Sequence, residues 1–112
     1  MIKSVMPLLK LVVVADEPAL LFSSISSAEG YLEAVDVENG VYPIAYDPTG
    51  KIYRLTTNGD HVVVEADSDL PADPDALQKV LFKLMTSRGF TFAAFPTLED
   101  LIVLAEQFVD DW

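Results

Sequence analysis

The chain has 112 residues and no cysteine, and its 18 acidic side chains outnumber seven basic ones, giving a formal net charge of −11. This length suits one domain, and the lack of cysteine excludes disulfides, thiolate metal sites and a cysteine nucleophile. Nucleic acids and anionic bilayers attract Lys and Arg, so the charge predicts neither a nucleic-acid nor a membrane partner. A basic protein partner would be attracted instead.

The N-terminal 18 residues combine a lysine with an apolar run, in the manner of a weak secretory signal. Lys10 interrupts this run and Pro7 lies inside it, so we expect a cytoplasmic protein. No apolar run reaches the roughly 20 residues that a membrane-spanning helix requires. Residues 9–15 are short, apolar and rich in Val, which predicts a buried strand. Residues 19–23 predict either a second short strand or the continuation of the first strand after a kink.

A helix is expected next, because Ser26 and Glu29 have the spacing of a capping box. Gly30 costs this helix about 1 kcal/mol relative to Ala, so it must depend on packing. Its predicted apolar face comprises Ala28, Tyr31, Leu32 and Val35.

A meander of three strands follows, bounded by turn residues. Residues 47–50, Asp-Pro-Thr-Gly, predict a turn, and Asn58-Gly59 predicts a type I′ hairpin. Strand alternation places Val62 and Val64 on one face and Glu65 on the other. The strands are expected at 41–47, 51–57 and 61–67.

The last third of the chain is predicted to be helical. Asp73 and Pro74 are typical of a helix start and Gly89 of a helix end, while Thr97 caps a final helix. The final apolar stripe comprises Leu98, Leu101, Ile102, Ala105, Val109 and Trp112. We therefore predict a single α+β domain over 1–112. Its antiparallel sheet contains the three-stranded meander plus one or two N-terminal strands, and about three helices cover one face.

Residues for catalysis or cofactor binding are sparse. The one histidine, His61, follows a hairpin turn, and neither a Gly-x-Ser-x-Gly elbow nor a Gly-rich phosphate loop is present. Asp67, Asp69, Asp73 and Asp75 carry oxygens that suit calcium, but the Gly and Glu of an EF-hand are out of register. We expect no enzyme, cofactor or metal site.

Two acidic sets are candidate docking surfaces for a partner. The first comprises Glu33, Asp36 and Glu38, which neither cap a helix start nor have catalytic spacing with a partner. The second comprises Glu65, Asp67 and Asp69. An exposed Phe90 or Phe95 beside such acids could anchor an interface, although core packing is the simpler role for these rings.

Residues 31–50 resemble small acidic immunity proteins that accompany bacterial polymorphic toxins of the Rhs type or of contact-dependent inhibition. The resemblance implies a stoichiometric inhibitor that binds a cognate toxin and occludes a basic active-site surface. The matching pieces are Tyr31-Leu32-Glu33, Asp36-Val37-Glu38-Asn39-Gly40 and Tyr46-Asp47-Pro48-Thr49-Gly50.

Two other functions stay open. A small ligand-binding or enzymatic domain would show a pocket with convergent polar groups and shifted titration. An acidic regulatory or scaffold subunit would use its carboxylates for solubility alone. A homo-oligomer could form through edge strands or the Phe-rich segment.

Overall fold

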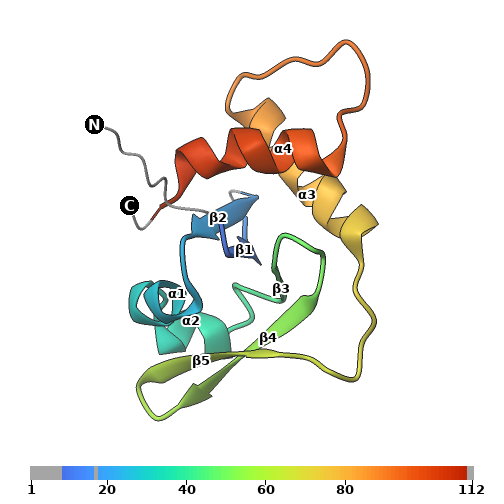
Figure 1. Ribbon diagram of the computed structural model, residues 1–112. Helices are drawn as coiled ribbons and strands as arrows, with labels where there is room; N and C mark the ends of the chain where they lie inside the picture. The colour runs from blue at the N-terminus through green and yellow to red at the C-terminus, as the bar shows by residue number, and fades with distance from the viewer. Residues whose placement is uncertain (1–8, 17, 111–112) are drawn as a thin grey trace, which may run out of the picture.

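The computed structural model describes residues 9–16 and 18–110 (Figure 1). Five strands form one antiparallel sheet in the order β2-β1-β3-β4-β5. This confirms the predicted α+β class and antiparallel sheet. The elements are β1 (Leu11–Val14), β2 (Ala19–Phe22), α1 (Ile25–Tyr31), α2 (Ala34–Glu38), β3 (Ala45–Tyr46), β4 (Ile52–Asn58), β5 (His61–Ala66), α3 (Pro74–Ser87), α4 (Leu98–Ala105) and the 3-10 helix η1 (Glu106–Phe108).

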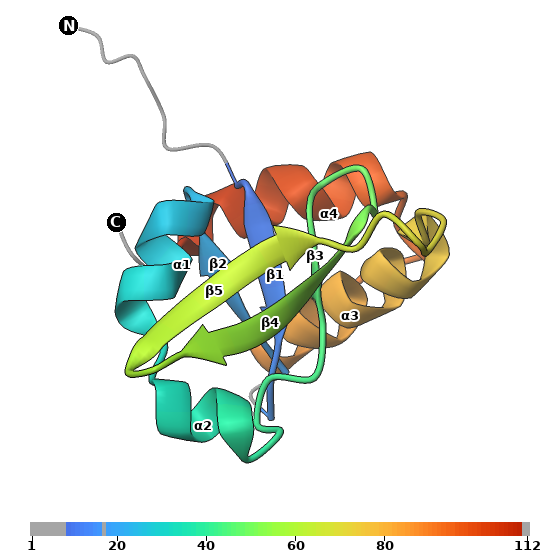
Figure 2. The same ribbon diagram turned by 90° about the horizontal axis from the view of Figure 1, so that it is seen from below.

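Strand β1 is buried on both faces of the sheet. Leu11 and Val13 join the core beneath α1 and α2, whereas Val12 joins the core beneath α3 and α4. Figure 1 shows the two helix pairs on opposite sides of β1 and β2. Figure 2, seen from below, shows β4 and β5 crossing in front of β1. The expectation that helices cover one face is therefore wrong, because an all-apolar strand has no polar side for solvent.

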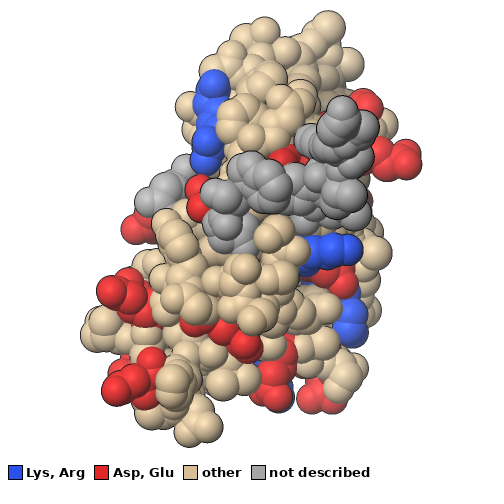
Figure 3. All heavy atoms as spheres, turned by 60° about the vertical axis from the view of Figure 1, so that its left-hand side comes forward, with Lys and Arg blue, Asp and Glu red and all other residues tan. Residues whose placement is uncertain are grey.

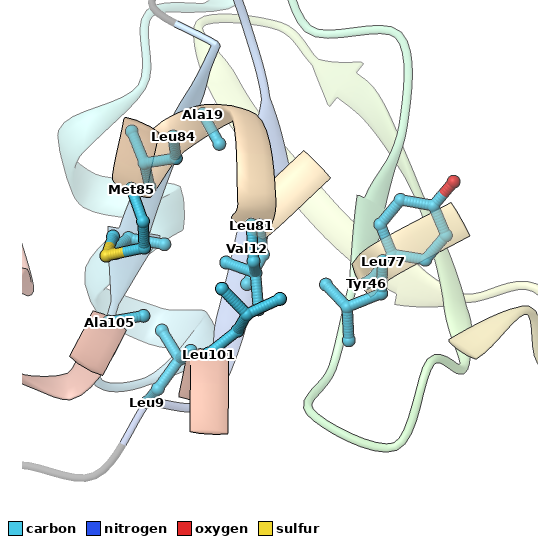
Figure 4. Close-up of a cluster of buried hydrophobic side chains, with 11 residues drawn as sticks. Leu9, Val12, Ala19, Tyr46, Leu77, Leu81, Leu84, Met85, Leu101 and Ala105 are labelled. Carbon is cyan, nitrogen blue, oxygen red and sulfur yellow. The ribbon is translucent and has the colours of Figure 1, made fainter. Parts of the chain in front are cut away.

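The core beneath α3 and α4 is built by helical spacing. Residues 77, 81, 84 and 85 of α3 recur at intervals of three and four, so they form one buried row. In Figure 4 this row meets Val12 of β1 and Tyr46 of β3, and Leu101 and Ala105 of α4 close the cluster. Trp112, the last residue of the predicted apolar stripe, lies outside the described residues.

The predicted first helix is two helices. The N-cap of α1 is Ser24, whose hydroxyl accepts a hydrogen bond from the Ser27 N–H at 3.0 Å, so the predicted Ser26 cap is wrong. Leu32 leaves the helix with an extended backbone and is buried, and α2 begins two residues later. Of the predicted apolar face, Ala28 and Leu32 are buried but Tyr31 and Val35 are exposed.

On each edge of the sheet, one backbone N–H donates a hydrogen bond to a side-chain carboxylate. The Val64 N–H of β5 donates to Glu29 Oε2 at 2.8 Å. The Leu21 N–H of β2 donates to Asp110 Oδ2 at 2.7 Å, and the Asp110 N–H returns a bond to the Leu21 carbonyl. Unpaired backbone groups on an edge strand can pair with a strand of another chain, so these two carboxylates limit such edge-to-edge association.

Most predicted turns and caps are confirmed. Asp73 and Thr97 cap α3 and α4, and Gly50 ends the 47–50 turn with φ +90°. The hairpin differs, because Asn58 pairs with His61 and leaves residues 59–60 as the loop. Gly59 alone has positive φ there, which is the type II′ pattern and not type I′.

No helix within 9–16 or 18–110 has both the length and the apolar character needed to cross a membrane.

Gly50 and Gly30 form a test pair for this packing. A Cβ on Gly50 would lie 2.6 Å from the Cα and N of Pro74, whereas a Cβ on Gly30 would meet nothing within 4 Å. We expect Gly50→Ala to lower the free energy of unfolding by about 1–3 kcal/mol from its backbone conformation alone, with the clash adding to this. Gly30→Ala should raise it by about 0.5–1 kcal/mol. Urea denaturation measures both changes, and equal effects would contradict the packing.

Removal of the β5 edge contact should destabilise the fold. Glu29→Ala leaves the Val64 N–H without its acceptor, which should cost about 1–3 kcal/mol in urea denaturation. Glu29→Gln keeps an acceptor oxygen and serves as the control with a smaller loss. Sedimentation velocity should also detect more self-association of Glu29→Ala. Identical behaviour of the two variants would show that the bond has no such role.

Candidate functional site

The acidic segment, residues 31–41, places apolar side chains in solvent beside carboxylates. It contains the end of α1, all of α2 and the turn at Gly40, where φ is +76°. The exposed fractions of Tyr31, Val35 and Val41 are 53%, 56% and 37%. Aromatic and apolar groups in this position can supply the buried area of a protein interface.

The Tyr31 ring is exposed and also held in place. It packs edge-on against the buried Phe22 ring of β2, with centroids 5.3 Å apart and an interplanar angle of 65°. A side chain already fixed by the core loses less rotamer entropy when a partner covers it. Tyr31 is therefore the preorganised aromatic anchor of the acidic segment.

The first predicted acidic set lies in this segment, but its members differ. Glu33 is the exposed N-cap residue of α2 and makes no side-chain cap bond, while Asp36 lies in the first helical turn. There the helix dipole favours the Asp36 carboxylate. Glu33 occupies the N-cap position without a side-chain bond and Glu38 ends the helix, so only Asp36 has a helix-start role that the prediction missed. Glu38 Oε2 accepts from the Thr57 hydroxyl at 3.2 Å, which ties α2 to β4.

The second predicted set has local structural partners. Glu65 stands directly opposite the exposed Arg54 in the β4–β5 ladder, where an opposite charge is a favourable neighbour. Asp67 Oδ1 accepts from the Asp69 N–H at 3.2 Å, and the Asp67 N–H donates to the Ile52 carbonyl. These contacts account for much of the set without a partner.

The two sets do not form one surface. Glu38 contacts Thr57 near the hairpin turn, whereas Asp67 follows Ala66, which pairs with Tyr53. Thr57 and Tyr53 are four residues apart on β4, or about 13 Å. In Figure 3 acidic side chains appear at several separate places on the visible face, most of them in its lower half. The first set, with its exposed apolar neighbours, is the better candidate.

A pocket of about 560 Å³ opens elsewhere on the surface. The Tyr53 hydroxyl donates to Asp47 Oδ2 at 3.5 Å inside it. Burial raises the pKa of Tyr53 above its ordinary value, and the charge of Asp47 and this hydrogen bond raise that pKa further. The pocket is lined by Leu9, Lys10, Ser23, Ser24, Ile25, Asp47, Pro48, Thr49 and Tyr53.

No cluster of three or more His, Asp or Glu side chains that could hold a metal ion exists among the described residues. His61 is exposed at the hairpin end of β5. Comparisons with protein families, with curated proteins and with solved structures found no match.

The apolar periodicity placed Tyr31 on a buried face, because the prediction treated residues 26–35 as one continuous helix. With α1 and α2 separate, residue 31 ends one helix and residue 35 belongs to the next. The available signal was Gly30 near the break, since glycine weakens a helix interior.

The Tyr53 environment predicts a loss of stability at high pH. A pKa raised by folding means that the protonated phenol stabilises the native state. This contribution is complete below the ordinary value of 10.0 and is lost as pH rises through the native pKa. Urea denaturation on either side of this range should show a smaller alkaline loss in Tyr53→Phe than in the parent. An unchanged loss would contradict the assignment.

Proposed function

We propose that this protein is a protein-binding module that receives a basic partner on the acidic segment. The observation that carries the proposal is the alternation of exposed Tyr31, Val35 and Val41 with three carboxylates in one short stretch. Apolar anchors supply the buried area, while carboxylates steer a cationic partner and make association fall with salt.

In its more specific form, the proposal is that the chain acts as an immunity protein, which binds a cognate toxin in the cytoplasm and neutralises it. A toxin that acts on nucleic acid requires cationic groups to bind phosphate. An acidic surface can cover those groups and exclude the substrate without chemistry of its own. The resemblance of residues 31–50 to such proteins supports this form, since it includes nearly the whole acidic segment.

Small-molecule binding is the second candidate function. The pocket beside Tyr53 and Asp47 combines an apolar lining with several polar groups, which is the usual composition of a ligand site. A ligand screen followed by thermal denaturation tests it. A ligand whose stabilising effect disappears in Tyr53→Phe would favour this function over a role limited to protein binding.

The adjacent gene product is the first partner to test by co-purification and titration calorimetry. With a bound partner, the double substitution Asp36→Lys/Glu38→Lys should weaken affinity by at least about tenfold, or about 1.4 kcal/mol. Tyr31→Ala should also weaken binding, because it removes the aromatic anchor.

A matched control separates local charge from net charge. Asp75→Lys/Glu99→Lys changes the net charge equally, and both residues are exposed acids in the first turns of α3 and α4. We expect this control to retain most of the affinity. Equal losses in the two double variants would exclude a docking role specific to the acidic segment, and the absence of any basic partner would refute the proposal.

A further inference from the structure

Residues 76–98 have the opposite character to the acidic segment. They contain none of the 18 acidic residues of the chain, but three of its seven basic residues and four of its six phenylalanines. This composition covers most of α3 and its connection to α4. In Figure 1 this connection forms the top of the molecule, and in Figure 3 the topmost atoms are tan, with blue atoms below them on the left and red atoms on the right.

An aromatic cluster with one exposed ring lies on this part of the fold. Phe95 is 56% exposed, and its ring centroid is 4.8 Å from that of Phe82 on α3. The Phe92 ring packs on Phe82 at 5.6 Å. The Gln78 side chain donates to the Pro96 carbonyl at 2.7 Å, which holds the connection against the same helix. The exposed ring is thus supported by fixed neighbours.

Two exposed lysines lie on the same helix as Phe82. Lys79 and Lys83 are exposed and four residues apart on α3, so they are neighbours on the helix surface. Lys79 is also three residues before Phe82, which makes it a neighbour of that ring. Arg88 is directed elsewhere, since its guanidinium lies 5.0 Å from the Phe108 ring centroid. Phe82, Phe92, Phe95, Lys79 and Lys83 are named the basic–aromatic surface.

We propose that the basic–aromatic surface is a second docking site, which binds an acidic protein segment carrying an apolar anchor. The apolar anchor would pack on Phe95, and carboxylates would meet Lys79 and Lys83. Such charge complementarity favours the correct partner and register.

A protein segment and an extended polyanion, such as a bilayer or a nucleic-acid duplex, differ in how much of the protein surface they contact. Charges are screened beyond about 8 Å at physiological salt, so a short segment responds mainly to the local lysines. A bilayer or nucleic-acid duplex extends over more of a molecule whose net charge is −11, and is repelled. The observations therefore favour an acidic protein segment.

The two docking surfaces belong to different layers of the fold. The basic–aromatic surface is carried by α3 and the connection that follows, whereas the acidic segment is carried by α1 and α2 on the other side of β1 (Figure 1). A basic and an acidic partner can therefore bind at once, which would make the protein an adaptor. The second docking site does not depend on the proposed function of residues 31–41, whereas the adaptor role rests on it.

A synthetic peptide that alternates Glu with Leu and Phe is the probe for this site, and its Lys-for-Glu counterpart is the control. In an amide NMR titration, the acidic peptide should shift resonances of α3 and of residues 90–97. Fluorescence anisotropy should show about fivefold weaker binding for Phe95→Ala and for Lys79→Glu/Lys83→Glu, as expected for local anchors and charges. Lys10→Glu/Lys51→Glu changes the net charge equally and should retain affinity.

Several results would overturn the proposal. These are equal binding of the basic peptide, equal losses in the two lysine double variants, or shifts that map to residues 31–41. Tighter binding of phosphatidylserine vesicles or duplex DNA would assign the surface to a polyanion. Self-association abolished by Lys79→Glu/Lys83→Glu would assign it to a second copy. Unchanged binding of a basic partner by that variant would show that the two sites are independent.

Discussion

The burial of β1 on both faces is the constraint on which the rest of the structure depends. Leu11, Val12 and Val13 have no exposed surface, so the strand requires a helix layer above and below it. At about 25 cal/mol per Å² of apolar surface removed from water, this burial is the main stabilising contribution of the N-terminal hairpin. The two layers follow from it, and they hold the two candidate docking surfaces apart.

The fold class was predictable because local signals agree with the tertiary structure. The apolar run of β1, the caps of α3 and α4 and the 47–50 turn each have a physical cause within a few residues of sequence. The packing of helices on both faces of the sheet was not predictable from any single element. It depends on how the helices from both halves of the chain are distributed over β1. The break at Leu32 was also not predicted from the apolar periodicity. Residues 32–33 separate α1 from α2, so a pattern that assumes one continuous helix assigns the wrong side chains to the buried face.

The candidate site was proposed from the sequence, but the structural roles of its acids were not predictable. The acids of residues 33–38 were identified from charge alone, whereas their structural roles in α2 and its contact with Thr57 required the fold. Glu29 and Asp110 show the same limit, because their edge contacts span 35 and 89 residues of sequence. The acidic side chains behind the net charge of −11 thus serve at sheet edges, at helix starts and on a remaining exposed surface. What distinguishes that surface is its exposed apolar residues, which composition does not reveal.

The central claim is that a basic partner binds the acidic segment while the α3–α4 layer stays free. Hydrogen–deuterium exchange of the chain alone and with its bound basic partner tests this most directly, because it locates protection without any substitution. The account predicts added protection in residues 31–41 and unchanged exchange in residues 79–95. Protection confined to residues 79–95, or spread evenly over both helix layers, would contradict it.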